Sequence, residues 1–457
     1  MTNPRQIAFI VLRDVHKGAY ADVALDKVLQ KVKLLDGESA VELLRDRRLA
    51  TELVYGSVRR QRTLDALIDQ FATKKSHQQP KDLRTILHLG LYQLRYQERI
   101  PPSAAVNTTV ELAKENGFAG LTGFVNGLLR QYIRLTKNSS EPLKLPENPV
   151  ERLGILHSLP DWIIQVWLEQ IGFVETKKLC EWMNQTPTID LRVNPLRSNL
   201  EQVKTALESA GILSRDILRL PQALRLISSP GLVQNLPGFT EGWWAVQDSS
   251  AQLVSHLLDP QPGEVVIDVC AAPGGKTTHI AELMQDQGKV WACDRTASRL
   301  RKLQENAQRL NLKSIEICVG DSRNLPQFYH TADRVLLDAP CSGLGTLHRH
   351  ADARWRQTPD SVRELSQLQK QLLSHTSNFV KNGGVLVYAT CTLHSAENEE
   401  VILGFLADNP QWQILPLEVS SPYSIYSTPQ GWLKVWPHRW DMDGFFMVRL
   451  RKTNDSE

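Results

Sequence analysis

Two cysteines, each just after a run of apolar residues typical of a strand, are the side chains best suited to covalent chemistry. Cys341 stands in Asp338-Ala-Pro-Cys-Ser-Gly343, and Cys391 stands in Thr390-Cys-Thr392. The carboxyl ends of parallel strands meet at one edge of a sheet, where ligands bind, so both thiols are expected at that rim. A thiolate there can attack a substrate as a nucleophile. The remaining cysteines fall inside predicted helices or strands and are expected to be buried apolar residues, with Cys270 also able to line a cofactor through its backbone: Cys180, Cys270, Cys293 and Cys318.

A small-residue turn follows another apolar run, in Asp268-Val-Cys-Ala-Ala-Pro-Gly-Gly-Lys-Thr-Thr-His279. It is not a phosphate-binding P-loop, because Cys270 stands where the first glycine is needed, and it lacks Gly-x-Gly-x-x-Gly. Acids follow the next two strands: Asp294 can accept hydrogen bonds from ribose hydroxyls, and Asp321 can contact an adenine amine. Acids without a phosphate clamp favour S-adenosylmethionine, with a plain nucleotide-binding or structural domain as the alternative. The expected cofactor-binding residues are Cys270, Ala271, Ala272, Pro273, Gly274, Gly275, Lys276, Asp294, Asp321 and Asp338.

Further polar residues accompany these motifs. Lys276 is the one cation in the first turn of the expected helix, where it can contact a cofactor carboxylate, orient Asp338 or remain solvated. His348 and His350 have no third ligand at a suitable spacing, so no metal site is expected. The loop around them is basic and aromatic, which favours phosphate contact and base stacking with RNA, although an ordinary amphipathic surface is the alternative. Its residues are Arg349, Arg354, Trp355 and Arg356.

The spacing of apolar residues predicts three domains. Residues 1–135 show helical spacing throughout, and residues 136–149 form a polar, proline-rich linker. Residues 150–240 mix helical segments, among them 200–210, with two strand-like runs at 189–194 and 223–227, which is typical of a small α+β domain. Residues 241–457 alternate short apolar strands with helices, which predicts a doubly wound, mostly parallel α/β sheet of the Rossmann type. The expected strands are 265–269, 289–293, 315–319, 334–337, 385–388 and 445–448.

Composition narrows the class of protein. The net charge is only +3, but residues 1–135 carry 21 Lys and Arg against 14 Asp and Glu, which favours a polyanionic partner such as nucleic acid. Surplus cations on a small helical domain are the ordinary alternative. No uncharged apolar run reaches the roughly 18 residues of a membrane span, so no membrane partner is expected. The chain has only six cysteines and none in paired spacing, which indicates a reducing compartment, and we expect the cytoplasm.

These motifs resemble those of the Nol1/Nop2/Sun family of RNA cytosine-C5 methyltransferases. The resemblance spans roughly residues 190–450 and rests on four motifs in the family's order: Cys270-Ala-Ala-Pro-Gly-Gly-Lys276, Asp338-Ala-Pro-Cys-Ser-Gly343, Thr390-Cys-Thr392 and Asp443-Gly-Phe-Phe446. The first domain resembles the NusB RNA-binding fold, with Gly123-Phe-Val-Asn-Gly-Leu-Leu-Arg130 as the closest local match. This fusion is typical of the Sun/Fmu group of bacterial 16S rRNA methyltransferases B. One departure is His348-Arg-His-Ala-Asp352, where the family often has Arg-Arg-His-Pro-Asp.

The resemblance implies a class I methyltransferase fold for the last domain. It implies methyl transfer from S-adenosylmethionine to carbon 5 of a cytosine in 16S rRNA, the site named cytosine 967 for this group, before the small subunit is fully assembled. It makes Cys391 the nucleophile that adds to carbon 6, and Cys341 the residue that assists proton removal and enzyme release. Asp338 is the acid expected to act at N3 of the ring. Two alternatives stay open: a transfer RNA cytosine-C5 methyltransferase, and a non-catalytic RNA-binding assembly factor.

Overall fold

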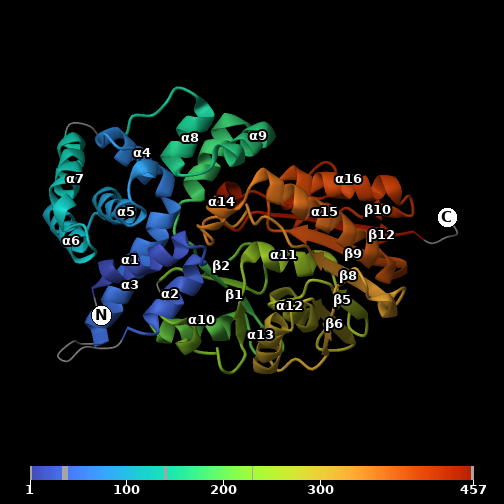
Figure 1. Ribbon diagram of the computed structural model, residues 1–457. Coiled ribbons are helices and arrows are strands. Elements are labelled where there is room, and N and C mark those ends of the chain that lie inside the picture. Colours follow the sequence, from blue (N-terminus) through green and yellow to red (C-terminus); the bar gives the residue numbers. More distant parts are fainter. Residues whose placement is uncertain (1–2, 33–39, 138–140, 229, 454–457) are drawn as a thin grey trace. The chain divides into compact units, whose positions relative to one another are not determined.

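The structure, a computed structural model, describes residues 3–32, 40–137, 141–228 and 230–453 (Figure 1). Residues 138–140 of the expected linker lie outside these ranges, as do residues 1–2 and 33–39 of the expected first domain. None of the helices in the described ranges is both long enough and apolar enough to span a membrane.

The chain forms two compact units. The helical unit comprises Met1–Asn184 together with His350–Arg356, and the α/β unit comprises Gln185–Arg349 together with Gln357–Glu457. The domain boundaries expected at residues 135, 149 and 240 stay predictions.

The helical unit consists of helices whose apolar residues recur at the expected spacing. Ile7 and Val11 of the first helix are fully buried. That helix begins at Pro4 and is capped by Asn3, whose side chain accepts a hydrogen bond from the Arg5 backbone at 3.0 Å. The helices are α1 (Pro4–His16), α2 (Ala21–Leu29), α3 (Ala40–Arg59), α4 (Gln61–Phe71), α5 (Lys81–Tyr96), α6 (Pro102–Glu115), α7 (Thr122–Thr136), α8 (Pro149–His157) and α9 (Asp161–Trp182). The predicted all-α character of the first domain is therefore confirmed.

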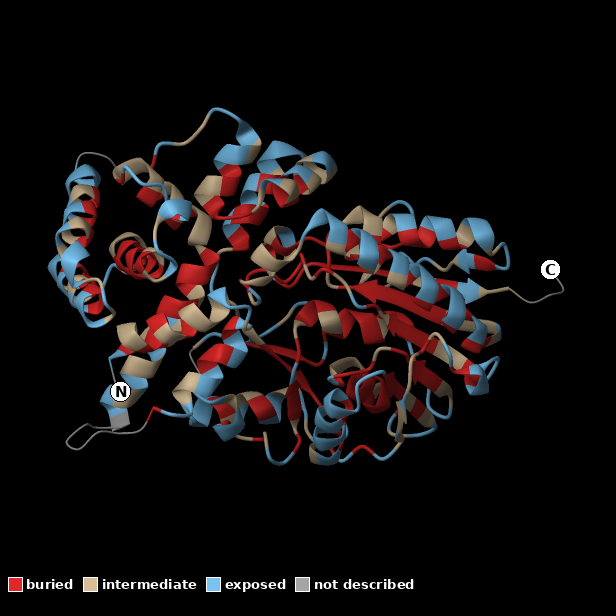
Figure 2. Ribbon diagram, viewed as in Figure 1, coloured by how far each residue is buried: buried red, intermediate tan, exposed pale blue. Residues whose placement is uncertain are grey.

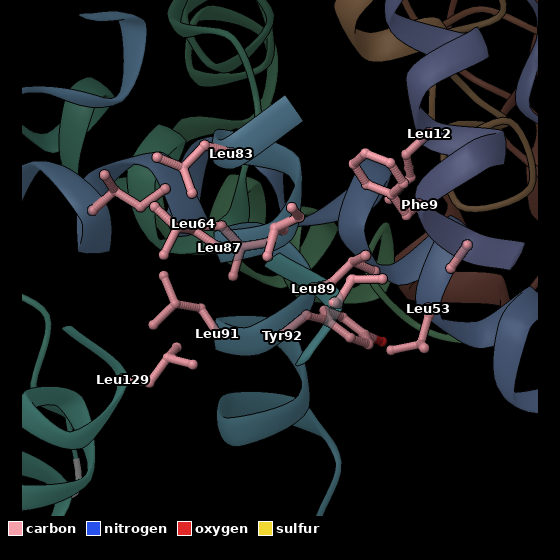
Figure 3. Packing of buried hydrophobic residues seen from close by; sticks show 14 of the residues in the cluster. Phe9, Leu12, Leu53, Leu64, Leu83, Leu87, Leu89, Leu91, Tyr92 and Leu129 are labelled. Carbon is pink, nitrogen blue, oxygen red and sulfur yellow. The ribbon is translucent and has the colours of Figure 1, made fainter. Parts of the chain in front are cut away.

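Helix α5 lies at the centre of this unit, because every residue from Thr85 to Gln93 is buried. Figure 3 shows Leu87 and Leu91 of α5 packed among leucines from the surrounding helices, including Leu64 of α4 and Leu129 of α7. Each fully buried leucine stabilises such a core by about 1.5–3 kcal/mol. A helix that is buried on all sides depends on the surrounding bundle for its stability.

A short segment from late in the sequence belongs to the helical unit. It contains α14 (Ala353–Arg356), and its Arg354 is fully buried. The Arg354 guanidinium donates at 3.1–3.2 Å to three backbone carbonyls, those of Arg59, Ser158 and Met183. Trp355 donates from Nε1 to the carbonyl of Val58 at 2.8 Å. The prediction that Arg354 contacts RNA is wrong, and so is the amphipathic-surface alternative for this residue, because its buried side chain holds helices of this unit together. Trp355 is half-buried against the same core, and its RNA contact stays a prediction.

The α/β unit begins with a small antiparallel sheet of strand order β2-β3-β1-β4. Its strands are β1 (Ile189–Val193), β2 (Ser214–Asp216), β3 (Ala223–Leu226) and β4 (Trp244–Val246), and α10 (Leu200–Ser209) follows β1. The predicted strands near 189–194 and 223–227 and the predicted helix from Leu200 are confirmed. The other two strands have only three residues each, too short for an alternating pattern to be recognised.

The larger sheet has eight strands, seven of them in the order β10-β12-β9-β8-β5-β6-β7, and β11 pairs with β12. The run β9-β8-β5-β6-β7 is parallel, whereas β12 is antiparallel to each of its neighbours. The strands are β5 (Val265–Asp268), β6 (Lys289–Asp294), β7 (Ile315–Val319), β8 (Ala332–Asp338), β9 (Val380–Thr390), β10 (Trp412–Ile414), β11 (Leu433–Val435) and β12 (Phe445–Lys452). The helices between them are α11 (Ser249–Leu258), α12 (Gly275–Leu283), α13 (Ala297–Arg309), α15 (Pro359–Thr376) and α16 (Glu399–Asp408), with the short α17 (Pro437–Trp440) before β12. The central strands are buried (Figure 2), and the predicted doubly wound, Rossmann-like fold is confirmed.

Candidate active site

In the turn between β5 and α12, position 274 lies so close to its neighbours that only glycine fits there. Gly274 has φ +105°, and a Cβ atom there would lie 2.5 Å from Cγ of Leu303. Beside it, Thr277 Oγ1 donates to Asp268 Oδ2 at 2.7 Å. Burial raises the pKa of Asp268 to about 7. Asp268 therefore holds the first turn of α12 instead of lining a cavity.

A cavity of about 470 Å³ opens at the carboxyl ends of the parallel strands. Eight of the residues expected from the sequence line it: Cys270, Ala272, Lys276, Asp294, Asp321, Asp338, Cys341 and Cys391. The rest of the expected set, Ala271, Pro273, Gly274 and Gly275, form the turn itself. Among the other lining residues are three arginines and three leucines of α15 that were not expected: Arg295, Arg299, Arg323, Leu365, Leu368 and Leu372. Helical spacing of the three leucines was the only signal for them in the sequence.

The two acids expected to meet the cofactor lie in different surroundings. Asp294 is buried, and its Oδ1 accepts from the backbone of Thr296 at 2.8 Å. Asp321 is part-exposed and binds the guanidinium of Arg323 through both oxygens, at 2.6 and 3.0 Å. The hydrogen bonds from Arg323 lower the pKa of Asp321 to about 2. Asp294 is thus the better placed acceptor for a neutral hydroxyl, because its ion-pair partner Arg299 lies 3.6 Å from Oδ2, beyond hydrogen-bond distance.

The two cysteines expected to do chemistry lie side by side. Their Sγ atoms are 3.4 Å apart, and both residues line the cavity. The hydrogen bond from Cys341 lowers the pKa of Cys391, and the same contact raises the pKa of Cys341 well above its usual value. The arrangement therefore favours a thiolate at Cys391 and a thiol at Cys341.

Lys276 is paired with Asp338 rather than solvated. Its Nζ lies 2.7 Å from Asp338 Oδ2 and 5.1 Å from the ring centroid of Phe445. Burial alone would lower the pKa of Lys276, but the charge of Asp338 outweighs it and the pKa is raised. Of the three roles considered for this lysine, the structure matches the orientation of Asp338.

A buried carboxylate that the sequence motifs did not point to fixes the Cys341 loop. Glu397 is fully buried, and its Oε1 accepts from the backbone of Ser342 at 2.8 Å and from Gln369 at 3.0 Å. Its Oε2 accepts from the Ser342 hydroxyl, which also lies 2.8 Å from Thr392 Oγ1. One acid thereby ties together the segments that carry both thiols.

Close backbone crossings set the positions of the same segments. The Gly345 backbone donates to the carbonyl of Cys391 at 2.9 Å and accepts from Gly444 at 2.9 Å. A Cβ at Gly345 would lie 2.1 Å from the Gly444 oxygen. The motif Asp443-Gly-Phe-Phe446 thus contributes its glycine to the position of Cys391.

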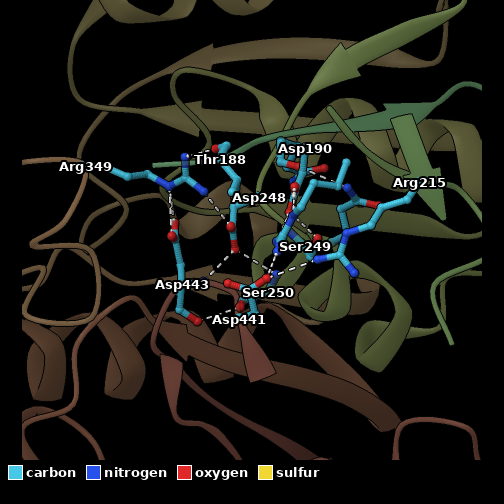
Figure 4. Close-up of polar contacts among 12 residues, drawn as sticks. Thr188, Asp190, Arg215, Asp248, Ser249, Ser250, Arg349, Asp441 and Asp443 are labelled. Carbon is cyan, nitrogen blue, oxygen red and sulfur yellow. Dashed lines mark hydrogen bonds and ion pairs between the residues drawn. The ribbon is translucent and has the colours of Figure 1, made fainter. Parts of the chain in front are cut away.

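Arg349 is locked in a polar network and is not free to bind RNA as predicted (Figure 4). Its Nε donates to Asp443 at 2.8 Å, its Nη2 to Asp248 at 2.8 Å, and its Nη1 to the Thr188 carbonyl at 2.7 Å. Asp248 also caps α11, because its Oδ1 accepts from the Ser250 backbone at 2.8 Å. The contacts with Asp443 and Thr188 join the motif loop before β12 to the residue preceding β1.

Arg192 of the small sheet makes a second buried link to the cofactor turn. It is fully buried and donates to both oxygens of Glu282 on α12 at 2.8 and 2.9 Å. It also donates to the carbonyl of Gly275 at 2.6 Å. The small sheet therefore positions the start of α12, the helix that carries Lys276.

Three family models match the chain. They are described as 16S rRNA methyltransferase RsmB/F (residues 255–451), the NusB family (residues 2–134) and a ferredoxin-like domain of RsmF/B-like methyltransferases (residues 159–232). Among solved structures, the protein PH0851 matches with a TM-score of 0.79 and 30% identity over 98% of this chain and 99% of its own. A methyltransferase homologue from Pyrococcus horikoshii matches with a TM-score of 0.59 and 28% identity over 67% of this chain and all of its own.

Full-length relatives agree with these matches. A probable ribosomal RNA small subunit methyltransferase B of Synechocystis is 48% identical over 99% of this chain and 100% of its own length. A protein of the same name from Bacillus subtilis is 34% identical over 99% of both chains. With its NusB domain, its ferredoxin-like sheet and its Rossmann-like sheet, the chain belongs to the RsmB/F family of ribosomal RNA small subunit methyltransferases.

Proposed function

We propose that the chain transfers a methyl group from S-adenosylmethionine to carbon 5 of one cytosine in 16S rRNA, the position named cytosine 967 in the resembled group. The pair of thiols carries the proposal, because Cys391 and Cys341 lie 3.4 Å apart on the wall of one cavity. Addition to a pyrimidine needs a thiolate, and proton removal afterwards needs a second group close by. The names of the relatives support small-subunit rRNA as the substrate, which the protein would meet in the cytoplasm.

The cavity fits the proposed cofactor in size and in donor set. Ligand cavities span roughly 300–1,000 Å³, and this one measures about 470 Å³. Asp294 would accept from the ribose hydroxyls, Asp321 would lie near the adenine, and the leucines of α15 offer an apolar wall. Bound there, S-adenosylmethionine would supply an electrophilic methyl group.

The side chains then have separate tasks. The Cys391 thiolate adds to carbon 6 of cytosine while N3 takes up a proton from solvent, which makes carbon 5 nucleophilic. The Asp338 carboxylate accepts a hydrogen bond from N3–H and stabilises the protonated ring. Carbon 5 would then take the methyl group of the bound cofactor, whose sulfur would leave as a neutral thioether. Once Cys391 is bonded to carbon 6, its negative charge is gone. The hydrogen bond and the charge of Cys391 then no longer raise the pKa of Cys341, which falls, while burial and the charge of Glu397 still hold it above the usual value. Cys341 can then give its proton to solvent, and its thiolate takes the carbon-5 proton. The electron pair of that C–H bond expels Cys391 from carbon 6 as a thiolate, and N3 returns its proton to solvent.

Bisulfite sequencing of total RNA tests the proposal. A strain that lacks the protein should lose 5-methylcytosine at one 16S rRNA position, and the wild-type chain but not Cys391→Ser should restore it. Loss of a tRNA signal instead would assign the transfer RNA substrate. An RNA that is bound but never methylated would leave only a non-catalytic assembly role.

A further inference from the structure

The helical unit contains a cavity of its own, of about 280 Å³. It lies where the start of α4 meets the ends of α5, α8 and α9. Its polar lining consists of Arg60, Arg95, Tyr96, His157, Glu181 and Asn184. None of these residues takes part in the site on the α/β unit.

Two guanidinium groups converge on one aromatic ring in this cavity. The central carbon of Arg60 lies 4.7 Å from the ring centroid of Tyr96, and that of Arg95 lies 5.5 Å from it. Arg95 is occupied, because it pairs with Glu141 at 2.6 Å. Within the described ranges Arg60 makes no ion pair. A guanidinium stacked on a ring keeps its N–H edge available for a phosphate.

The surroundings of Arg60 favour an anion. Burial, together with the charges of Arg59 and Arg60, lowers the pKa of the nearby Arg354 well below its usual value, which indicates a positive potential. Arg354 borders the cavity through Asn184, whose Oδ1 accepts from it at 3.2 Å. A positive potential in a part-buried cavity attracts phosphate more strongly than solvated surface cations do.

His157 and Glu181 indicate that the ligand has hydrogen-bonding groups besides a phosphate. His157 is only 7% exposed, and its Nε2 has no hydrogen-bond partner among the described residues. Burial lowers the pKa of His157 to about 4, so near neutral pH its ring is an uncharged donor and acceptor. Glu181 places a carboxylate in the same lining. An acid repels phosphate but accepts hydrogen bonds from hydroxyl or amine groups, so a ligand that has both suits the cavity.

We propose that this cavity binds one ribonucleotide of the RNA substrate other than the methylated cytosine, with its phosphate on Arg60 and its hydroxyl or base donors toward Glu181 and His157. The inference rests on the proposed function only in taking RNA as the substrate. The cavity gives the NusB-containing unit a defined contact with RNA, in addition to its general positive charge.

Arg60→Gln tests the contact, and Arg134→Gln is the matched control, because Arg134 is exposed on α7 outside residues 123–130, the closest local match to NusB, and its substitution removes the same charge. Filter binding of a 16S rRNA transcript should show about tenfold weaker binding for Arg60→Gln, the lower end for a charge-assisted hydrogen bond. The slope of log K against log salt should shrink by about 0.7–0.9, as expected for one lost phosphate contact. Equal affinities and slopes for the two variants would overturn the proposal.

Two further measurements keep the outcome decisive. Wild-type protein crosslinked to 4-thiouridine-substituted RNA should yield a labelled peptide that contains Tyr96, and labelling only elsewhere contradicts the site even if Arg60→Gln does not fold. Calorimetry with cytidine and adenosine monophosphates tests whether the cavity binds a free nucleotide instead of a nucleotide within RNA. The RNA subsite is refuted if Arg60→Gln abolishes tight binding of the free monophosphates but leaves the affinity for RNA unchanged. If the wild-type chain methylates no cytosine but Arg60→Gln still weakens RNA binding, the proposed function fails while the subsite stands.

Discussion

Cys391 and Cys341 come from segments 50 residues apart in the sequence, and their sulfur atoms lie 3.4 Å from each other. This contact lowers the pKa of Cys391 and raises that of Cys341. The two thiols are therefore chemically distinct before any substrate arrives, and each can be tested by itself.

Cys391→Ser is expected to abolish methyl transfer, because a serine hydroxyl does not ionise near neutral pH without strong activation. Binding of S-adenosylmethionine should persist, since Asp294 and Asp321 are unchanged. A methyl-transfer assay and calorimetry on the same preparation check both statements. Measurable turnover by the purified variant would remove Cys391 from the role of nucleophile.

Cys341→Ala is expected to attack and methylate RNA but to release it slowly, because the carbon-5 proton has lost its acceptor. A denaturing gel with labelled RNA should show a slow-moving band for this variant. The control is Cys341→Ala/Cys391→Ala, which should show no band. Absence of the band in both would mean that the roles are exchanged or wrong.

Asp294→Ala is expected to weaken cofactor binding by about 10- to 150-fold, the range for a lost hydrogen bond of about 1.5–3 kcal/mol to a charged group. Asp321→Ala should cost less, because Arg323 already occupies both oxygens of that carboxylate. Calorimetry with S-adenosylmethionine compares the two. A larger loss for Asp321→Ala would place the ribose at the end of β7 instead of β6.

The stability of the fold should depend on Asp268 between mildly acidic and mildly alkaline pH. Burial raises the pKa of Asp268 from 3.8 to about 7. The unfolded chain loses this proton at lower pH than the folded chain does, so the carboxyl stabilises the folded state progressively less as pH rises through that interval. Asp268→Asn has no carboxyl to titrate at this position. The free energy of unfolding of the variant minus that of the wild type should therefore increase from about pH 5 to about pH 8. Urea denaturation at both values measures it, and a difference that does not vary with pH would contradict the assignment.

Arg192→Met is expected to destabilise the protein by about 3–5 kcal/mol, because Glu282 is left as a buried charge without its partner. Arg192→Met/Glu282→Leu should recover most of that loss, because no buried charge remains. Cofactor affinity gives a second readout: the double variant should still bind S-adenosylmethionine more weakly, since Gly275 has lost the donor that holds its carbonyl. Full recovery of both stability and affinity would make the ion pair purely structural.

Much of the fold follows from local patterns. The long parallel strands appear in the sequence as apolar runs before Asp268, Asp294 and Asp338, and their shared rim brings the expected acids and thiols to one cavity. Helix starts depend on single residues: α6 begins at Pro102 because the fixed φ of proline suits the first helical position.

The residues that the sequence did not reveal act through tertiary contacts. Glu397 meets Ser342 across 55 positions, and Arg192 meets Glu282 across 90, so no local spacing connects them. Arg354 resembled a surface cation because its partners are backbone carbonyls, which leave no trace in residue types. The same side chain would bind RNA or hold helices depending only on whether it is buried.

The placement of His350–Arg356 within the helical unit changes what a cut in the linker would do. Beyond the bonds of Arg354 and Trp355, Arg356 donates to the carbonyl of Gly18 at 3.1 Å. A protease that cleaves between α7 and α8 would therefore cut the chain into two fragments, and these hydrogen bonds would hold the two fragments together. The two products should migrate together in gel filtration and separate only in denaturant. We expect the same two fragments, made separately, to reassemble into a methyltransferase without an added dimerisation tag.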